Sequence, residues 1–251
     1  MINRYILIFG TSANPIHQGH IDLIISGTQA LLERGMNIQM VVLMPVYRRN
    51  PIDLEEKDSL PITFEHRYSM CQLAAREVTK HLATLGVETS VSWLEAELSQ
   101  KTSRPNFTAE TLEVMRASTD LETGFILFLG EDAFSGGEPP FSRWHQVEKI
   151  FHLAVIAISP RPDFQANQAF LNELKDKNAQ IIYLDNLNIR EISSRQIRSR
   201  LASGEDPMKL FTEGLLSKEI AQYIKEKKLV SVWSKLKLID PDESDPQHTC
   251  Q

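Results

Sequence analysis

The feature that most constrains this chain is a short loop between a buried strand and a helix near its amino terminus. The apolar run Tyr5–Phe9 predicts the strand, and the apolar periodicity of Gly19–Arg34 predicts the helix. In an open parallel sheet such a loop lies at the carboxyl ends of the strands, where ligands bind. The free N–H groups and the positive dipole end of the helix favour a phosphate. With His17 and His20 beside that helix start, we interpret the loop as a nucleotide-phosphate site.

Apolar runs alternate with helical patterns along most of the chain, which is typical of a doubly wound, mainly parallel α/β sheet. The predicted strands are Tyr5–Phe9, Ile38–Met44, Val87–Trp93, Phe125–Leu129, Ala154–Ile158 and Ile181–Leu184. The predicted helices are Gly19–Arg34, Thr63–Leu85 with Thr63 as its cap, Thr108–Ala117, Phe141–Ile150, Gln165–Lys177, a segment starting at Ser193, and Leu215–Lys228. The predicted loops are Val46–Pro61, Leu94–Asn106 and the Gly- and Pro-interrupted segment Ala133–Pro140. We expect one domain over residues 1–230 with a small helical part at its end, followed by a disordered or loosely attached polar tail, 231–251.

Composition excludes several classes of protein. A formal net charge of −6 over 251 residues argues against a general nucleic-acid-binding surface but leaves room for a local basic pocket. Cys71 and Cys250 do not form a disulfide framework, so a cytoplasmic location is the default. No apolar segment approaches the length of a membrane span, and the first apolar run is too short for a signal peptide. The sequence does not decide the oligomeric state, and a homo-oligomer is possible.

A second helix start near the end of the chain also has the features of an anion site. In Ile-Ser-Ser-Arg-Gln-Ile-Arg, 192–198, the spacing of Ser193 and Gln196 predicts a capping box. Ser194 adds a hydroxyl, and Arg195 and Arg198 share one face of the helix. Guanidinium groups beside free backbone amides suit phosphate oxygens. A capped surface helix with solvated arginines is the alternative, to which we give at least equal weight for Arg195 and Arg200.

The two helix starts resemble known signatures. Asn-Pro-Ile-His-x-Gly-His, 14–20, is similar to the signature of the nucleotidylyltransferase superfamily. Residues 192–198 resemble the second signature of nicotinate/nicotinamide mononucleotide adenylyltransferases, and segments 65–70, 107–112 and 130–134 also resemble that family. The resemblance covers about residues 5–229 and implies a Rossmann-like nucleotidylyltransferase fold.

The resemblance implies a role for each matching residue. The implied roles are catalysis by His17, His20 and Arg198; ATP binding by Gly10, Thr11, Ser12, Gly19, Gly130, Asp132, Ser193 and Ser194; and acceptor binding by Asn14, Arg49, Thr108 and Trp144. Some of these positions have structural alternatives, because Thr108 could be only a helix cap and Trp144 only a core residue. For Arg67 we favour a structural role, on the helix surface or in an ion pair.

The implied reaction is adenylyl transfer from ATP to the 5′-phosphate of nicotinate or nicotinamide mononucleotide, in NAD biosynthesis. The sequence shows no compact carboxylate cluster, so we expect Mg²⁺ to arrive with ATP and no protein metal site. Thr11 and Ala13 depart from the family pattern, which has Gly and an aromatic residue there. Two alternatives therefore stay open: a related adenylyltransferase with another phosphorylated acceptor, and a non-catalytic nucleotide-binding regulator. The choice between nicotinate and nicotinamide is not decided.

Overall fold

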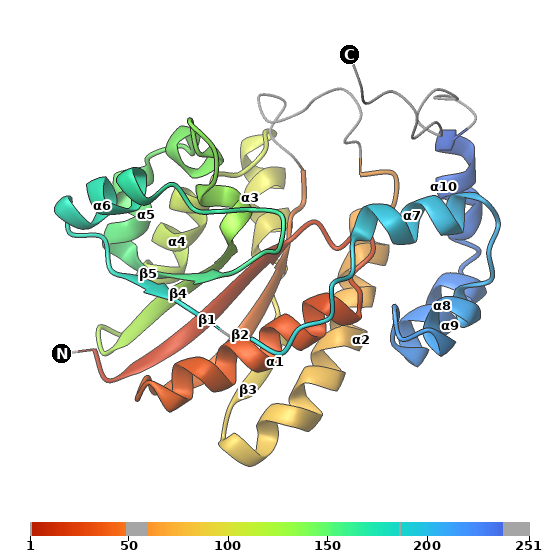
Figure 1. Ribbon diagram of the computed structural model, residues 1–251, viewed down its shortest axis with the longest axis horizontal. Helices are drawn as coiled ribbons and strands as arrows, with labels where there is room; N and C mark the ends of the chain where they lie inside the picture. Colours follow the sequence, from red (N-terminus) through yellow and green to blue (C-terminus); the bar gives the residue numbers. More distant parts are fainter. Residues whose placement is uncertain (1, 49–59, 186, 238–251) are drawn as a thin grey trace.

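The computed structural model describes residues 2–48, 60–185 and 187–237. At the centre of this part of the chain is a parallel sheet in the strand order β3-β2-β1-β4-β5-β6 (Figure 1). The strands are β1 (Arg4–Thr11), β2 (Ile38–Pro45), β3 (Glu88–Val91), β4 (Thr123–Gly130), β5 (Ala154–Ser159) and β6 (Ile181–Tyr183). The order reverses at β1, which pairs with β2 on one side and β4 on the other. The carboxyl ends of β1 and β4 therefore form the switch point where this class of sheet binds ligands.

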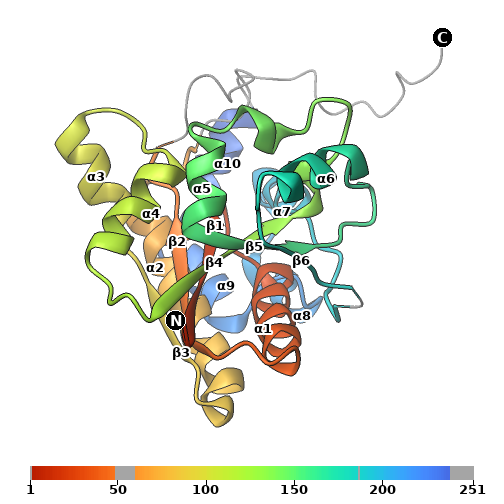
Figure 2. The same ribbon diagram turned by 90° about the vertical axis from the view of Figure 1, so that its left-hand side faces the viewer.

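Two helical layers cover the sheet, because alternate strand residues point to opposite faces. The helices are α1 (Gln18–Glu33), α2 (Phe64–Leu82), α3 (Leu94–Thr102), α4 (Thr108–Ala117), α5 (Val147–Leu153), α6 (Gln168–Asp176), α7 (Ser194–Ala202), α8 (Pro207–Thr212), α9 (Lys218–Glu226) and α10 (Val230–Lys237) (Figures 1 and 2). Leu7 and Phe9 of β1 lie in the core with α1, α2 and α7–α10, whereas Ile8 lies in the core with α4, α5 and α6. Among the described helices, none is both long and apolar enough to cross a bilayer.

The doubly wound parallel sheet is confirmed, and each predicted strand is present with ends shifted by a few residues at most. The central strands are buried on both faces, so their sequences are nearly unbroken apolar runs. The helix Thr108–Ala117 is also confirmed with its predicted bounds.

The prediction of a loop over Leu94–Asn106 is wrong for its first part, which is helix α3. Its buried residues are Glu95, Ala96 and Ser99. Because two of these three are polar, the segment carries no apolar period that would indicate a helix. The buried Glu95 carboxylate accepts a hydrogen bond from Thr111 Oγ1 at 2.8 Å, which ties α3 to α4.

Two helices in the second half of the chain start later than predicted, each after a polar residue. Phe141–Ile150 is not one helix but a 3₁₀ turn, Pro140–Arg143, followed by α5, with Gln146 at a left-handed φ of 53° between them. Helix α8 was not predicted, and the helix expected from Leu215 starts at Lys218 because the Ser217 hydroxyl caps it.

The first residues of the predicted tail form a helix. Residues 231–237 belong to helix α10 rather than to a polar tail, and Trp233 on this helix is only 2% exposed. The sequence around Trp233 contains several polar residues, and so its pattern did not predict this short helix. Residues 238–251 of the predicted tail lie outside the described residues.

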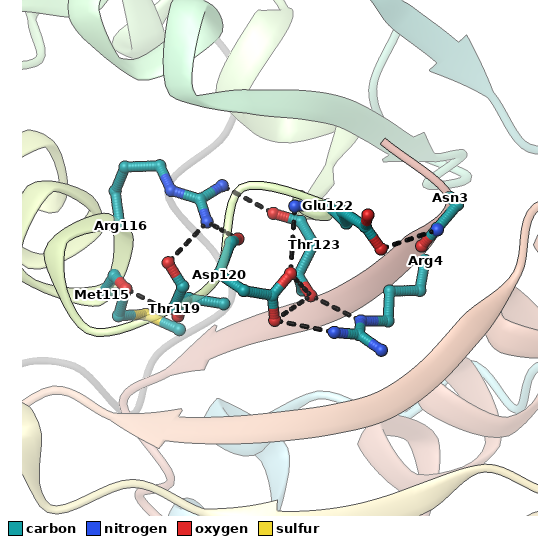
Figure 3. Close-up of polar contacts among 8 residues, drawn as sticks. All are labelled: Asn3, Arg4, Met115, Arg116, Thr119, Asp120, Glu122 and Thr123. Carbon is teal, nitrogen blue, oxygen red and sulfur yellow. Dashed lines mark hydrogen bonds and ion pairs between the residues drawn. The ribbon is translucent and has the colours of Figure 1, made fainter. Parts of the chain in front are cut away.

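A polar network closes the amino-terminal edge of the sheet, opposite the switch point (Figure 3). Arg116 at the end of α4 donates to the carbonyls of Thr119, Asp120 and Thr123. Arg4 of β1 bonds Asp120 and the Thr123 hydroxyl, each at 2.8 Å. These contacts fix the turn from α4 to β4 at the edge away from the switch point, so their role is structural.

Candidate active site

The loop after β1 is held in shape by the hydroxyl of Thr11 and by one buried arginine. Thr11 is buried, and its hydroxyl accepts the Ala13 N–H at 3.0 Å, which helps to hold Ala13 at a φ of 49°. Arg67 of α2 is 1% exposed and donates to the carbonyls of Ser12 at 3.0 Å and Val46 at 2.6 Å. A side chain so buried is not on the helix surface, so that part of the expectation for Arg67 is wrong. Arg67 instead joins the loop after β1 to the loop after β2 through these hydrogen bonds.

Two glycines of the predicted ATP site have different surroundings. Gly10 is exposed, and a Cβ atom there would meet nothing within 4 Å. At Gly19 a Cβ would lie 3.0 Å from the Arg190 carbonyl oxygen and 3.3 Å from the His17 ring. Gly19 therefore allows the segment before α7 to approach the start of α1, which is a packing reason for glycine at this position.

His17 and His20 lie together at the start of α1, with their ring centroids 3.8 Å apart. The His17 N–H donates to His20 Nδ1 at 3.3 Å. His20 therefore carries its proton on Nε2, which leaves an N–H donor on the outer side of the ring. His17 is 4% exposed, and its Nδ1 has no hydrogen-bond partner among the described residues. The side chains of His17 and His20 together cap the start of α1, each facing the backbone N–H of the other residue.

Burial and nearby cations keep both imidazoles neutral. Burial lowers the pKa of His20 to about 3, and the positive charge of Arg161 contributes to the shift. The pKa of His17 is also well below its usual range, first because of burial and then because of His20, Arg161 and Arg198. At neutral pH the pair therefore offers neutral hydrogen-bonding groups in a positive environment, which suits polyphosphate oxygens.

The second helix start packs directly on the first loop. Ser194 Oγ donates to the Pro15 carbonyl at 3.4 Å, and Arg198 Nη1 donates to the Asn14 carbonyl at 3.1 Å. Ser193 caps α7, but its hydroxyl accepts the Arg195 N–H at 3.2 Å rather than that of Gln196, so the predicted capping box is wrong in its partner. The two helix starts that the sequence singled out separately thus pack against the same stretch of backbone.

Solvated arginines on a capped surface helix were the alternative for Arg195 and Arg200, and the structure places these two side chains differently. Arg200 bonds Glu205 at 2.6 Å and also pairs with Glu213, so it ties α7 to α8. Arg195 is exposed, as expected for a solvated arginine.

The segments after β4 and β5 together supply a charged pair to the same edge. A Cβ on Gly130 would lie 2.2 Å from Asp132 Oδ1 and 2.7 Å from Arg161 Nε, so a larger residue there would displace these two side-chain ends. Asp132 and Arg161 form an ion pair at 3.1 Å. The neighbouring Glu131 carboxylate accepts the backbone N–H groups of Arg161 and Ala166, which fixes the loop after β5.

Arg161 is a functional candidate that sequence reasoning missed. Its charge lowers the pKa of both His17 and His20, so it lies within electrostatic range of the histidine pair. The available signal was its position two residues after β5, at the carboxyl edge of the sheet.

Two of the predicted acceptor-binding residues, Thr108 and Trp144, lie on segments that contact each other. Phe107, not Thr108, is the residue before α4, so the interpretation of Thr108 as a cap is wrong. The Phe107 ring lies 4.3 Å from that of His145, which joins the segment carrying Thr108 to the one carrying Trp144. Trp144 packs on Phe141 at 5.1 Å and lines a cavity of about 840 Å³ between α5 and α6.

Two other acceptor predictions have different outcomes. Asn14 is 6% exposed, and its Oδ1 accepts the indole N–H of Trp233 at 3.2 Å. The position of this oxygen is therefore set from within the protein. Arg49 lies outside the described residues.

The chain matches the cytidylyltransferase-like family over residues 8–200. It is 30% identical over 226 residues to a protein of Anaeromyxobacter dehalogenans, with 90% of this chain and 96% of that protein covered. A protein of Hydrogenovibrio crunogenus is 27% identical over 237 residues, with 90% and 98% covered. Both are named "probable nicotinate-nucleotide adenylyltransferase".

A solved structure has a similar fold. It is the nicotinic acid mononucleotide adenylyltransferase of Plasmodium falciparum, complexed with NaAD. Its TM-score is 0.67 at 20% sequence identity, with 91% of this chain and 98% of that chain covered.

Proposed function

The chain belongs to the cytidylyltransferase-like family and, within it, to the nicotinate-nucleotide adenylyltransferases, and on this premise we propose that it transfers the adenylyl group of ATP to nicotinate mononucleotide. The observation that carries the proposal is the meeting of two helix starts on one loop. The α1 start brings His17 and His20, and α7 brings Ser194 at its start and Arg198 one turn later, with the Asn14–Pro15 backbone between them. This arrangement lies at the switch point of the sheet.

In the proposed reaction an oxygen of the acceptor 5′-phosphate attacks the α-phosphorus of ATP. A new P–O bond forms, the bond from the α-phosphorus to the bridging oxygen breaks, and pyrophosphate leaves with the electron pair. The acceptor phosphate is already an anion, so no protein nucleophile is required. Catalysis then rests on alignment and on stabilisation of the developing charge.

Each group of the site has a role in that step. The neutral His20 ring donates its Nε2–H to a phosphate oxygen near the reacting centre. Because the ring is already neutral at neutral pH, it does not have to lose a proton first. Arg198 and the free amides of α7 hold the β- and γ-phosphates. Arg161 adds positive charge from the loop after β5, oriented by its pair with Asp132.

Magnesium is proposed to enter as part of the ATP complex. Among the described residues, no group of three or more His, Cys, Asp and Glu side chains is placed to hold a metal ion. Mg²⁺ commonly binds through one or two carboxylates plus substrate phosphates, and Asp132 is a carboxylate at this edge of the sheet. When bound, the ion would neutralise charge on the phosphates.

The compartment and the partners complete the proposal. We propose ATP and a pyridine mononucleotide as partners, and a cytoplasmic location, which the free buried thiol of Cys71 supports. A homo-oligomer stays a prediction.

The test is pyrophosphate release from ATP and Mg²⁺ with nicotinate mononucleotide, nicotinamide mononucleotide or phosphopantetheine as the acceptor. We expect turnover with nicotinate mononucleotide, the acceptor class in the names of the relatives. Turnover with phosphopantetheine alone would identify a different acceptor. ATP binding without pyrophosphate release from any of them would instead indicate a nucleotide-binding regulator.

A further inference from the structure

Helix α10 adds a buried residue to the site from outside the matched family region. The family match ends at residue 200, whereas α10 spans Val230–Lys237. Figures 1 and 2 show α10 beside α7, the helix that carries Arg198. Trp233 is one of the largest fully buried side chains of the described structure and lies in the same core as Ile197 and Leu201 of α7.

The indole of Trp233 reaches the loop after β1 itself. Its Nε1–H donates to Asn14 Oδ1 at 3.2 Å, and both residues are buried. The carbonyl of the same Asn14 accepts the bond from Arg198 at 3.1 Å, and the next carbonyl, Pro15, accepts the bond from Ser194. One residue thus links α10, the loop after β1 and the start of α7.

We propose that Trp233 is a positioning residue that acts through Asn14 to hold Arg198 and the two helix starts in register for ATP. This inference rests on the proposed function, because it assigns Trp233 to the same ATP site. A buried amide oxygen without its donor carries a desolvation cost, so the Asn14 side chain would turn to find another partner. The Asn14 backbone would move with it and shift the carbonyl that holds Arg198. Trp233 itself touches no substrate.

The matched variants are Trp233→Phe and Val232→Ala. Trp233→Phe keeps an aromatic ring in the core and removes the N–H donor. Val232→Ala removes packing from the same helix, where Val232 lies partly buried against that core, and leaves the indole in place. We expect Trp233→Phe to lower kcat/KM for ATP about tenfold, which is ~1.4 kcal/mol. We expect Val232→Ala to lower the unfolding temperature while kcat/KM stays within twofold.

A double-mutant cycle identifies the route of the effect. In an Asn14→Ala background, which is itself impaired, adding Trp233→Phe should change kcat/KM less than twofold. The inference is overturned if Trp233→Phe costs the same tenfold with and without Asn14, or nothing in the wild type. An equal kinetic loss in Val232→Ala would also overturn it, because helix stability alone would then explain the result.

A binding experiment separates failure of the inference from failure of the proposed function. The chain has three tryptophans, so ¹⁵N-indole spectra contain three side-chain N–H signals, and Trp233→Phe assigns one of them. Adding ATP with Mg²⁺ and no acceptor should shift the Trp233 signal in the wild type and not in Asn14→Ala. ATP binding by calorimetry without that shift overturns the inference alone. A shift without adenylyl transfer to any acceptor supports the inference and refutes only the proposed reaction. Absence of ATP binding refutes both.

Discussion

Replacement of His20 by glutamine tests the electrostatics of the site through the pH dependence of folding. Burial and Arg161 lower the pKa of His20 to about 3 in the folded protein. In the unfolded chain the same group has its ordinary pKa near 6.5. The unfolded state therefore binds more protons between these two values. The stabilising contribution is fully present above pH 6.5 and is lost as the pH falls below it.

The magnitude follows from the two pKa values. Between pH 7 and pH 5 the unfolded histidine becomes almost fully protonated, whereas the folded one stays neutral. Integrating the proton difference gives a loss of about 2 kcal/mol from His20 alone. This figure changes little if the folded pKa is one unit higher, because such a pKa still lies below pH 5. His17, whose pKa is also lowered, adds a further loss that remains in the His20→Gln variant.

The assay is urea denaturation of the wild type and of His20→Gln at pH 7 and pH 5. We expect the wild type to lose about 2 kcal/mol more unfolding free energy than the variant between the two pH values. Arg34, exposed at the far end of α1, gives a control, because Arg34→Gln should leave the wild-type pH dependence unchanged. Equal losses in the wild type and in His20→Gln would show that His20 is not held neutral, and would refute its assignment as a neutral donor.

Four further substitutions test the site and its supports. His20→Ala should lower kcat in the pyrophosphate assay by about 100-fold or more while the circular dichroism spectrum is unchanged, and unaltered turnover would rule out its catalytic role. Arg198→Ala should chiefly raise KM for ATP, by about tenfold, and an unaltered KM would contradict its phosphate role. Arg67→Met should lower the unfolding free energy by about 3 kcal/mol in urea, because it removes the hydrogen bonds of a buried guanidinium to three carbonyls; a loss below about 1 kcal/mol would contradict this. Arg116→Met should lower the unfolding temperature by about 4 °C, and a changed kcat would contradict its purely structural role.

The sheet could be predicted from the sequence because its signals are local. Runs such as Phe125–Leu129 and Ala154–Ile158 are buried on both faces, and so they are apolar throughout. The two helix starts could be predicted for the same reason, since each motif combines a turn, a polar group and a helix within a few residues. The order of these elements along the chain then indicates that their carboxyl ends meet at one edge.

The contacts that build the site were less accessible, because they join residues far apart in sequence. Asn14 and Trp233 are separated by 219 positions, and the bond between Pro15 and Ser194 spans 179. The polar character of the segment that contains Trp233 indicated a tail. Arg161 lowers the pKa of the two histidines only because folding brings the loop after β5 near them. No local pattern encodes any of these three contacts.

The departures at Thr11 and Ala13 can now be interpreted from what the loop provides. The groups that the loop offers to its neighbours are backbone carbonyls: Ser12 to Arg67, Asn14 to Arg198 and Pro15 to Ser194. Neither Thr11 nor Ala13 contributes a side chain to these bonds, and the Thr11 hydroxyl instead helps to hold Ala13 in its left-handed conformation. A loop whose neighbours bind its main chain can change these two side chains and still hold both helix starts in place. The departures therefore argue less for loss of catalysis than the sequence alone indicated.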